Sequence, residues 1–223
     1  TFTRYFKNFH LDEVIYYLHE FPYGRLLTSV IGECCPNVRR IGFQHGPASV
    51  RKLFYFMGDE EATTLTSYID HAPIPDRVLA EDEDSKEIYE KAGYKNVKVM
   101  DEIYRLSYLD AIKINRDNSV LIALGMHDAK PMLNVLLPLI KKNNSIHYVI
   151  KPHPRANNDF LENINIDNVE ISNKRIDELL SKACKVYVTY SSVGIEAKYL
   201  GTDVVIVNIP GIINESPLLQ CNG

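Results

Sequence analysis

The chain has 223 residues, of which 45% are hydrophobic and 24% charged, a composition that is ordinary for a globular protein. Its length allows one or two domains that each bury a core. A net charge of −4 gives no reason to expect a nucleic acid as a partner, and no apolar run reaches the roughly 18 residues that a membrane span requires. Composition therefore argues against a nucleic-acid-binding protein and against a membrane-spanning one.

The four cysteines show neither the paired spacing of a metal site nor the framework of a secreted disulfide-rich domain. The sequence does not begin with methionine, and we expect no signal peptide in residues 1–8, because they are aromatic and basic. We therefore expect a cytoplasmic protein, which could associate peripherally with the inner face of the cytoplasmic membrane. We also expect this chain to be a piece of a longer one.

The first half of the chain alternates short runs of β-branched and aromatic residues with helical segments. Pro36 ends the first helical segment and Gly93 ends the second. Such alternation is typical of a parallel α/β sheet. The expected strands are 13–20, 39–46, 77–80 and 96–100, and the expected helices are 24–35 and 84–92.

A polar segment at 110–118 separates this half from a second one, in which the alternation begins again. We interpret 111–223 as one Rossmann-like domain and 1–110 as part of another that is incomplete. The expected strands of the second half are 119–124, 146–151, 169–172, 186–189 and 203–207, and the helices between them are 130–142, 158–163, 175–184 and 193–200.

Two short motifs follow strands of the second half, at the positions where ligands of open α/β sheets bind. The first places His153 between Pro152 and Pro154, which fix the backbone on both sides of the imidazole. Lys151 and Arg155 bring two positive charges to the same loop. This pattern suits an anionic oxygen, with the imidazole as hydrogen-bond donor or general acid. The alternative is a loop of solvated charges whose prolines merely end a strand.

The second motif is the pair Ser191 and Ser192, which precedes the helix at 193–200. The unpaired N–H groups and the dipole of a helix N-terminus attract anions, and the two hydroxyls add donors at the same place. The pair could therefore hold a phosphate without a metal ion or a glycine-rich loop. The alternative is that one of the two serines simply caps the helix.

The order of these motifs resembles that in the GT-B glycosyltransferases that use CMP-activated sugars, which include bacterial sialyltransferases, polysialyltransferases and Kdo transferases of capsule and lipopolysaccharide assembly. It is also similar to that in the CDP-glycerol glycerophosphotransferases of teichoic acid synthesis. The resemblance covers about 13–211, and its matching residues are His45, Gly46, His153, Pro154, Tyr190, Ser191 and Ser192.

The resemblance implies a GT-B-like fold with two Rossmann-like domains, and a metal-independent transfer of an acidic sugar from a CMP-linked donor to a hydroxyl of a glycan or glycolipid. No separate cofactor is implied. His153 would contact the donor phosphate and protonate it as it leaves, Ser191 and Ser192 would bind that phosphate, and Glu196 would reach the ribose or base. The other expected donor-site residues are Gly125, Lys151, Pro154, Arg155, Tyr190 and Gly194.

Such a transfer also requires a general base for the acceptor hydroxyl, and we expect it in the first half. The candidates are Glu20 and His45, with His19 as a third. The related sialyltransferases use a carboxylate in an acidic-acidic-glycine motif, which this sequence lacks. Two alternatives therefore stay open: Glu20 as an ion-pair partner of Arg25, and His45 as a turn residue bonded to the backbone.

Two acidic motifs have alternative explanations. The run at 81–84 could bind a metal as in GT-A transferases, but we favour Asp84 or Ser85 as the cap of the next helix. His127 and Asp128 could form a dyad, although such a pair before a helix usually caps it. Because the sequence has no HExxH or CxxC pattern, we expect no metal site.

Two other functions remain open. A CDP-alditol phosphotransferase would use His153 and Ser191 on the same phosphate, but its acceptor would attack phosphorus. A catalytically silent nucleotide-binding module of a larger protein would bind the nucleotide without transfer.

Overall fold

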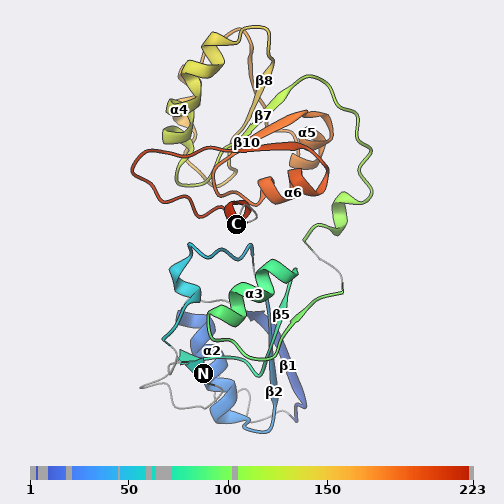
Figure 1. Ribbon diagram of the computed structural model, residues 1–223, viewed down its shortest axis with the longest axis vertical. Coiled ribbons are helices and arrows are strands. Elements are labelled where there is room, and N and C mark those ends of the chain that lie inside the picture. The colour runs from blue at the N-terminus through green and yellow to red at the C-terminus, as the bar shows by residue number, and fades with distance from the viewer. Residues whose placement is uncertain are drawn as a thin grey trace. The chain divides into compact units, whose positions relative to one another are not determined.

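The computed structural model describes residues 4, 10–18, 22–44, 46–58, 62–63, 72–101 and 105–220 (Figure 1). The chain divides into two compact units, Thr1–Ile103 (unit 1) and Tyr104–Gly223 (unit 2), and each is described by itself. The division falls before the boundary that we expected at 110. Both units are α/β and their sheets are parallel, which confirms the expected Rossmann-like class of fold.

Unit 1 contains a four-stranded parallel sheet in the order β1-β2-β5-β6 and a short parallel pair, β3-β4. The strands and helices expected from the sequence are confirmed wherever the structure describes them. The elements of unit 1 are β1 (Glu13–Leu18), α2 (Pro22–Cys34), β2 (Arg39–Gln44), η1 (Leu53–Tyr55), β3 (Ala62–Thr63), β4 (Ala72–Pro73), β5 (Arg77–Ala80), α3 (Glu83–Lys91) and β6 (Val97–Val99).

Helix α3 begins earlier than the sequence suggested. Its N-cap is Asp82, whose carboxylate accepts a hydrogen bond of 2.7 Å from the backbone N–H of Ser85. Our expectation that Asp84 or Ser85 caps this helix is therefore wrong. Both residues lie in the first turn of the helix. There the negative charge of Asp84 interacts favourably with the positive end of the helix dipole.

Unit 2 contains a five-stranded parallel sheet in the order β11-β10-β7-β8-β9. All the strands expected in this half are present, while the helix expected at 158–163 is a 3₁₀ helix. The elements are η2 (Ser107–Leu109), β7 (Val120–Ala123), α4 (Ala129–Lys142), β8 (Tyr148–Lys151), η3 (Asp159–Asn163), β9 (Val169–Ile171), α5 (Ile176–Lys182), β10 (Lys185–Val188), α6 (Val193–Tyr199), β11 (Asp203–Ile206) and η4 (Pro217–Gln220).

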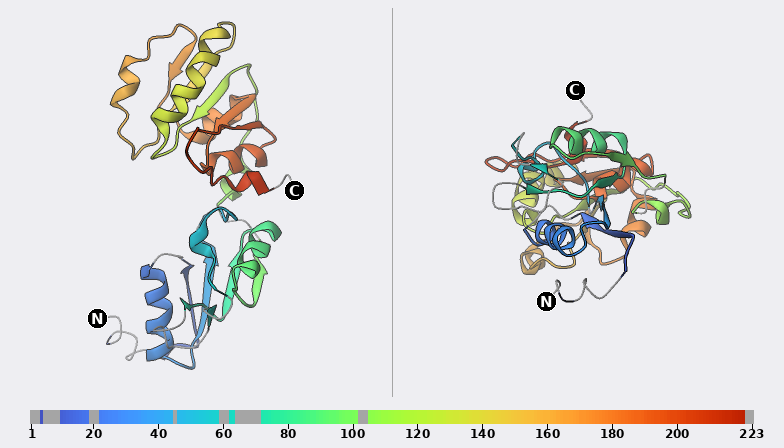
Figure 2. Two further views of the ribbon diagram at one scale, coloured as in Figure 1. Left: turned by 60° about the vertical axis from the view of Figure 1, so that its left-hand side comes forward. Right: turned by 90° about the horizontal axis from the view of Figure 1, so that it is seen from below.

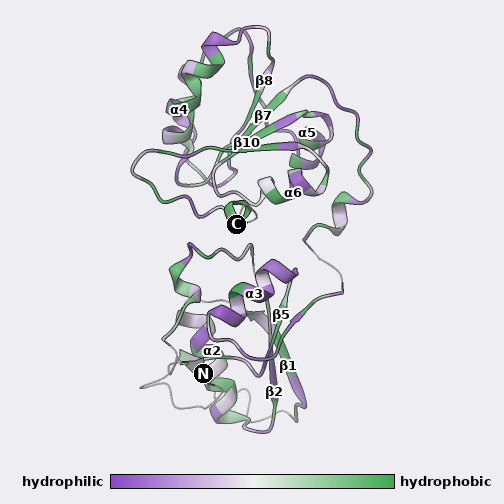
Figure 3. Cartoon of the chain, in the orientation of Figure 1, coloured by the Kyte–Doolittle hydropathy of each residue, from purple (hydrophilic) through white to green (hydrophobic). Residues whose placement is uncertain are grey.

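Helices cover both faces of this sheet (Figures 1 and 2). On one face Ile122 of β7 packs against Met132 of α4, and on the other Leu121 packs in a cluster with Leu180 of α5 and Ala197 of α6. Because β7 is buried on both faces, it reads as a continuous apolar run, and Figure 3 shows it in hydrophobic colours. The composition of β7 thus fits a strand that is buried on both faces.

The strand order contains one reversal. The chain passes from β7 to β8 and β9 on one side, and returns to β10 and β11 on the other side of β7. In open α/β sheets a crevice forms at such a reversal, outside the carboxyl ends of the two strands concerned, and ligands bind there. The topology therefore directs attention to the residues that follow β7 and β10.

The segment at 105–118 belongs to unit 2. Arg116 donates hydrogen bonds to the backbone carbonyls of Leu180, Ala183 and Leu200, the last two at 2.8 Å, and so ties the segment to the ends of α5 and α6. Leu109 of η2 is buried as well. These contacts explain why the polar segment, which looks like a linker in the sequence, is not the division between the units.

Candidate functional site at the carboxyl edge of unit 2

The two predicted phosphate motifs lie at one edge of one sheet. Strand β7 pairs with β8 so that Ala123 is opposite Lys151, and Gly125 and His153 each follow two residues after these positions. On its other side β7 pairs with β10, with Ile122 opposite Tyr187, and Tyr190 follows three residues later. Since neighbouring strands are about 4.8 Å apart, the ends of β8 and β10 lie roughly 10 Å apart with the end of β7 between them.

The imidazole of His153 is held by its own loop. Its Nδ1 accepts a hydrogen bond of 3.2 Å from the backbone N–H of Arg155, so the neutral ring carries its proton on Nε2. Burial, followed by the positive charges of Arg155 and His127, lowers the pKa of His153 below its usual value. At neutral pH the ring is therefore an uncharged donor through Nε2–H.

This electrostatic setting predicts proton uptake when a phosphate binds. A phosphate dianion beside His153 would raise its pKa in the complex, whereas in the free protein the pKa lies below the usual value of about 6.5. Protonation of His153 then favours the complex. The affinity for CMP therefore increases as the pH falls through the pKa of His153 in the complex, and it stops increasing below the pKa of His153 in the free protein. Titration calorimetry in buffers of different ionisation enthalpy measures the uptake.

His153→Gln is the control for this measurement, because it keeps a hydrogen-bond donor but cannot take up a proton. The part of the proton uptake that this variant loses belongs to His153. Equal uptake by the wild type and the variant would contradict a contact between His153 and the phosphate.

The other residues of the His153 loop are more open to solvent. Lys151 is half-buried and Arg155 is exposed, while Pro152 is buried and Pro154 exposed. The carbonyl of His153 accepts hydrogen bonds from the backbone N–H of Ala156 and from the amide of Asn158, both at 3.1 Å. The loop is thus internally bonded, and its two cations are accessible.

The two serines at the start of α6 have partners within the protein. Ser191 Oγ accepts a hydrogen bond of 3.3 Å from the backbone N–H of Val193, so Ser191 satisfies one N–H group at the helix start. Ser192 occupies the N-cap position without a side-chain cap bond, and its hydroxyl bonds to the carboxylate of Glu196. The capping alternative therefore accounts for Ser191 in the structure as it stands.

Close packing around Gly194 leaves little room for a side chain at this position. A Cβ atom there would meet side-chain atoms of Val188 and Leu218 at 3.0 Å. Gly194 is also buried, so it packs against β10 and Leu218 and is not exposed at the carboxyl edge.

Glu196 is hydrogen-bonded to Tyr108 of η2, which precedes the first strand of this sheet. Its side chain is 8% exposed and accepts a hydrogen bond of 3.0 Å from the hydroxyl of Tyr108. Burial raises the pKa of Glu196, and the bond from Tyr108 and the charge of Arg105 oppose that shift. A ribose that reached this carboxylate would have to replace Tyr108.

Sequence reasoning undervalued Asp128. It stands at the N-cap position of α4 but makes no side-chain cap bond, so the expectation that it caps the helix is wrong. Its carboxylate is buried at the end of β7, between the two motifs. Gly125, which lies three residues earlier, was the available signal, because a glycine between a strand and a helix often leaves room for a close polar contact.

The candidates for the general base, Glu20, His45 and the third candidate His19, lie outside the described residues. Gln44, immediately before His45, is buried at the end of β2. Its amide donates to Gly46 O and to Ser85 Oγ. The assignment of the base stays a prediction.

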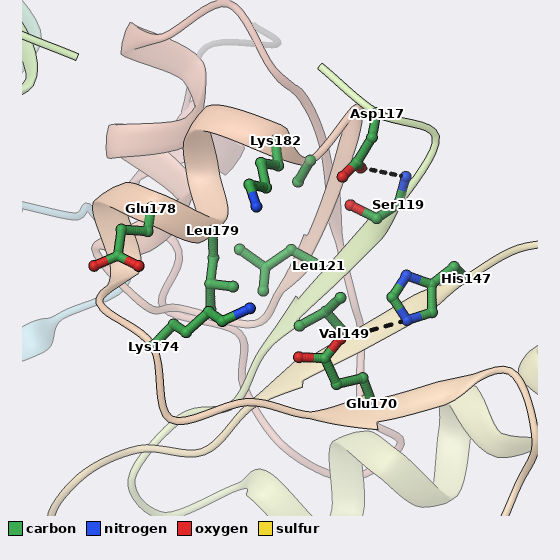
Figure 4. A pocket seen from close by; sticks show the side chains of 11 residues that line it. Asp117, Ser119, Leu121, His147, Val149, Glu170, Lys174, Glu178, Leu179 and Lys182 are labelled. Carbon is green, nitrogen blue, oxygen red and sulfur yellow. Dashed lines mark hydrogen bonds and ion pairs between the residues drawn. The ribbon is translucent and has the colours of Figure 1, made fainter. Parts of the chain in front are cut away.

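A hollow of about 90 Å³ lies toward the opposite, amino edge of unit 2 (Figure 4). Leu121, Val149 and Leu179 form its apolar floor, and charged side chains of both signs surround it. Among them His147 lies 3.6 Å from the carboxylate of Glu170. None of the predicted donor-site residues lines this hollow, so it is separate from the candidate site.

The described residues contain neither a metal-binding cluster nor a membrane-spanning helix. In that part of the chain no three His, Cys, Asp or Glu side chains come together in a way that could hold a metal ion. Of the helices that the structure describes, none has the length and apolar character needed to cross a membrane.

Comparison with known proteins assigns no family to the chain. No family model and no curated protein matches it.

Proposed function

We propose that the chain is a GT-B-type glycosyltransferase of bacterial surface-carbohydrate synthesis, and that unit 2 binds its CMP-linked donor at the carboxyl edge of the sheet. The observation that carries the proposal is the position of His153 and the serine pair at one edge, on either side of β7, beside the reversal of the strand order. The proposal would have lost its basis if the two motifs lay at opposite edges.

In the proposed reaction a hydroxyl of a glycan or glycolipid attacks the anomeric carbon of an acidic sugar. The bond between that carbon and the phosphate oxygen breaks, CMP leaves with the bonding electrons, and the hydroxyl proton passes to a general base. Negative charge grows on the phosphate, so donors that are already in place lower the barrier. Nε2–H of His153 and the cations Lys151 and Arg155 are suited to that task.

The base remains proposed from the resemblance alone, with Glu20 and His45 as the candidates. The alternative transfer of a CDP-linked alditol would place a second phosphate at the same edge.

A thermal-shift comparison of CMP, CDP, UDP and GDP tests the donor class. A ligand that binds only the folded state stabilises it by about 2.7 kcal/mol at a hundred times its dissociation constant. We expect the largest shift with CMP, and a smaller one when Ser192→Ala removes a hydroxyl from the start of α6. A larger shift with UDP or GDP than with CMP would overturn the assignment of the donor.

A further inference from the structure

The carboxylate of Asp128 is buried without a hydrogen-bond partner. The residue is 3% exposed, and among the residues that the structure describes nothing donates to either of its oxygens. A buried charge without a partner is costly. Its place at the N-cap position of α4 offsets part of this cost, because α4 is a helix of 14 residues whose positive end attracts a negative charge.

The carboxylate of Asp128 packs closely against the backbone of Gly125 at the end of β7. A Cβ atom on Gly125 would lie 2.0 Å from Asp128 Oδ1, so any other residue at this position would displace the carboxylate. In dinucleotide-binding folds the space between the glycine after a strand and the start of the next helix receives a phosphate of the ligand. In this chain the protein's own carboxylate occupies that space.

Groups of opposite charge lie at different strand ends along the carboxyl edge of the unit 2 sheet. Burial, and then the negative charges of Asp128 and Glu215, raise the pKa of Tyr190. The hydroxyl of Thr189, which is 2% exposed, also has no partner among the described residues. The cations Lys151 and Arg155 are at the end of β8, on the other side of β7. The negative charges of Asp128 and Glu215 therefore act at the end of β10, whereas the two cations lie at the end of β8.

We infer that Asp128 is a specificity-determining residue that limits the site to ligands with one phosphate. This inference rests on the proposed function. A single phosphate can bind at the basic end of β8. The second phosphate of a nucleoside diphosphate would have to approach the start of α4, where the buried carboxylate repels it, and charges of like sign repel strongly where water is excluded. Asp128 thus favours a CMP-linked donor over a CDP-linked one.

The test compares the affinities of CMP and CDP by titration calorimetry. For the wild type we expect CMP to bind at least about tenfold more tightly. Asp128→Asn removes the charge with little change of shape, and Asp128→Ser also removes it and supplies a residue that caps helices well. In both variants we expect the preference for CMP to fall by about tenfold, which corresponds to about 1.4 kcal/mol, mainly through tighter binding of CDP. The matched control, Asp167→Asn, removes one charge before β9 at the amino edge and should leave the ratio unchanged.

Thermal unfolding without ligand adds an independent readout. Because Asp128 carries an unpaired buried charge, Asp128→Asn should raise Tm by about 2–4 °C, equivalent to roughly 1 kcal/mol for a chain of this size. A lower Tm would show that the carboxylate is paired in solution and would overturn the inference.

The outcomes separate the inference from the proposed function. If CMP binding depends on His153 but the ratio of CMP to CDP affinity is the same in the wild type and both Asp128 variants, the inference fails and the proposed function stands. If the wild type binds neither nucleotide, or binds CMP equally well without His153, the proposed function fails and the inference fails with it.

Discussion

The His153→Ala variant is expected to lose about 10²–10⁴-fold in transfer rate and to bind CMP about 1–3 kcal/mol more weakly. The first effect is the usual contribution of a positioned proton donor to catalysis, and the second is the usual cost of leaving a charged partner without its hydrogen bond. Both follow from a ring whose Nδ1 is engaged by its own loop, which leaves Nε2–H as its donor. Transfer kinetics and calorimetry measure the two effects separately.

His147→Ala is the matched control, because His147 precedes the same strand, β8, at the amino edge of the sheet. This variant should transfer and bind as the wild type does. CMP binding that depends on His153, with no transfer in the wild type, would favour the silent nucleotide-binding module. Unchanged CMP binding in His153→Ala would contradict the proposed site.

The Arg116→Ala variant should lower the free energy of unfolding of unit 2 by about 2–4 kcal/mol. The guanidinium donates to three backbone carbonyls at the ends of α5 and α6. Its removal leaves all three acceptors without that donor, and a hydrogen bond from a charged group typically contributes about 1.5–3 kcal/mol. Urea unfolding followed by circular dichroism, together with hydrogen exchange of the α5 and α6 amides, measures the loss.

Arg175→Ala provides the comparison. Arg175 is an exposed arginine of the same unit, and its carboxylate partner is Asp177 at 3.0 Å. Exposed ion pairs contribute little, so we expect a change below about 1 kcal/mol. Equal effects of the two substitutions would show that Arg116 does not hold the segment at 105–118 in place.

The elements of both units could be predicted from local patterns. The run of β7, VLIA, is apolar throughout, and such a run predicts a strand that is buried on both faces. Caps were predicted less well. At the start of α3 three neighbouring residues, Asp82, Asp84 and Ser85, are good caps, and only the backbone geometry selects Asp82 among them.

The same limit applies at the start of α4. In the sequence Asp128 is indistinguishable from an ordinary N-cap residue. Its lack of a cap bond and its burial against Gly125 depend on how α4 packs against the end of β7. Similarly, the engagement of Glu196 by Tyr108 joins residues that are far apart in the sequence, and no pattern of spacing indicates it.

The amino-acid sequence by itself determined the alternation of strands and helices and the chemistry at each strand end, because these depend on neighbouring residues and on the period of the apolar pattern. Only the tertiary structure decided the order β11-β10-β7-β8-β9, and with it that the histidine and serine motifs flank one strand end that carries a buried carboxylate. That order depends on which apolar faces pack against which helices. Such contacts join distant parts of the chain, and local propensity does not encode them.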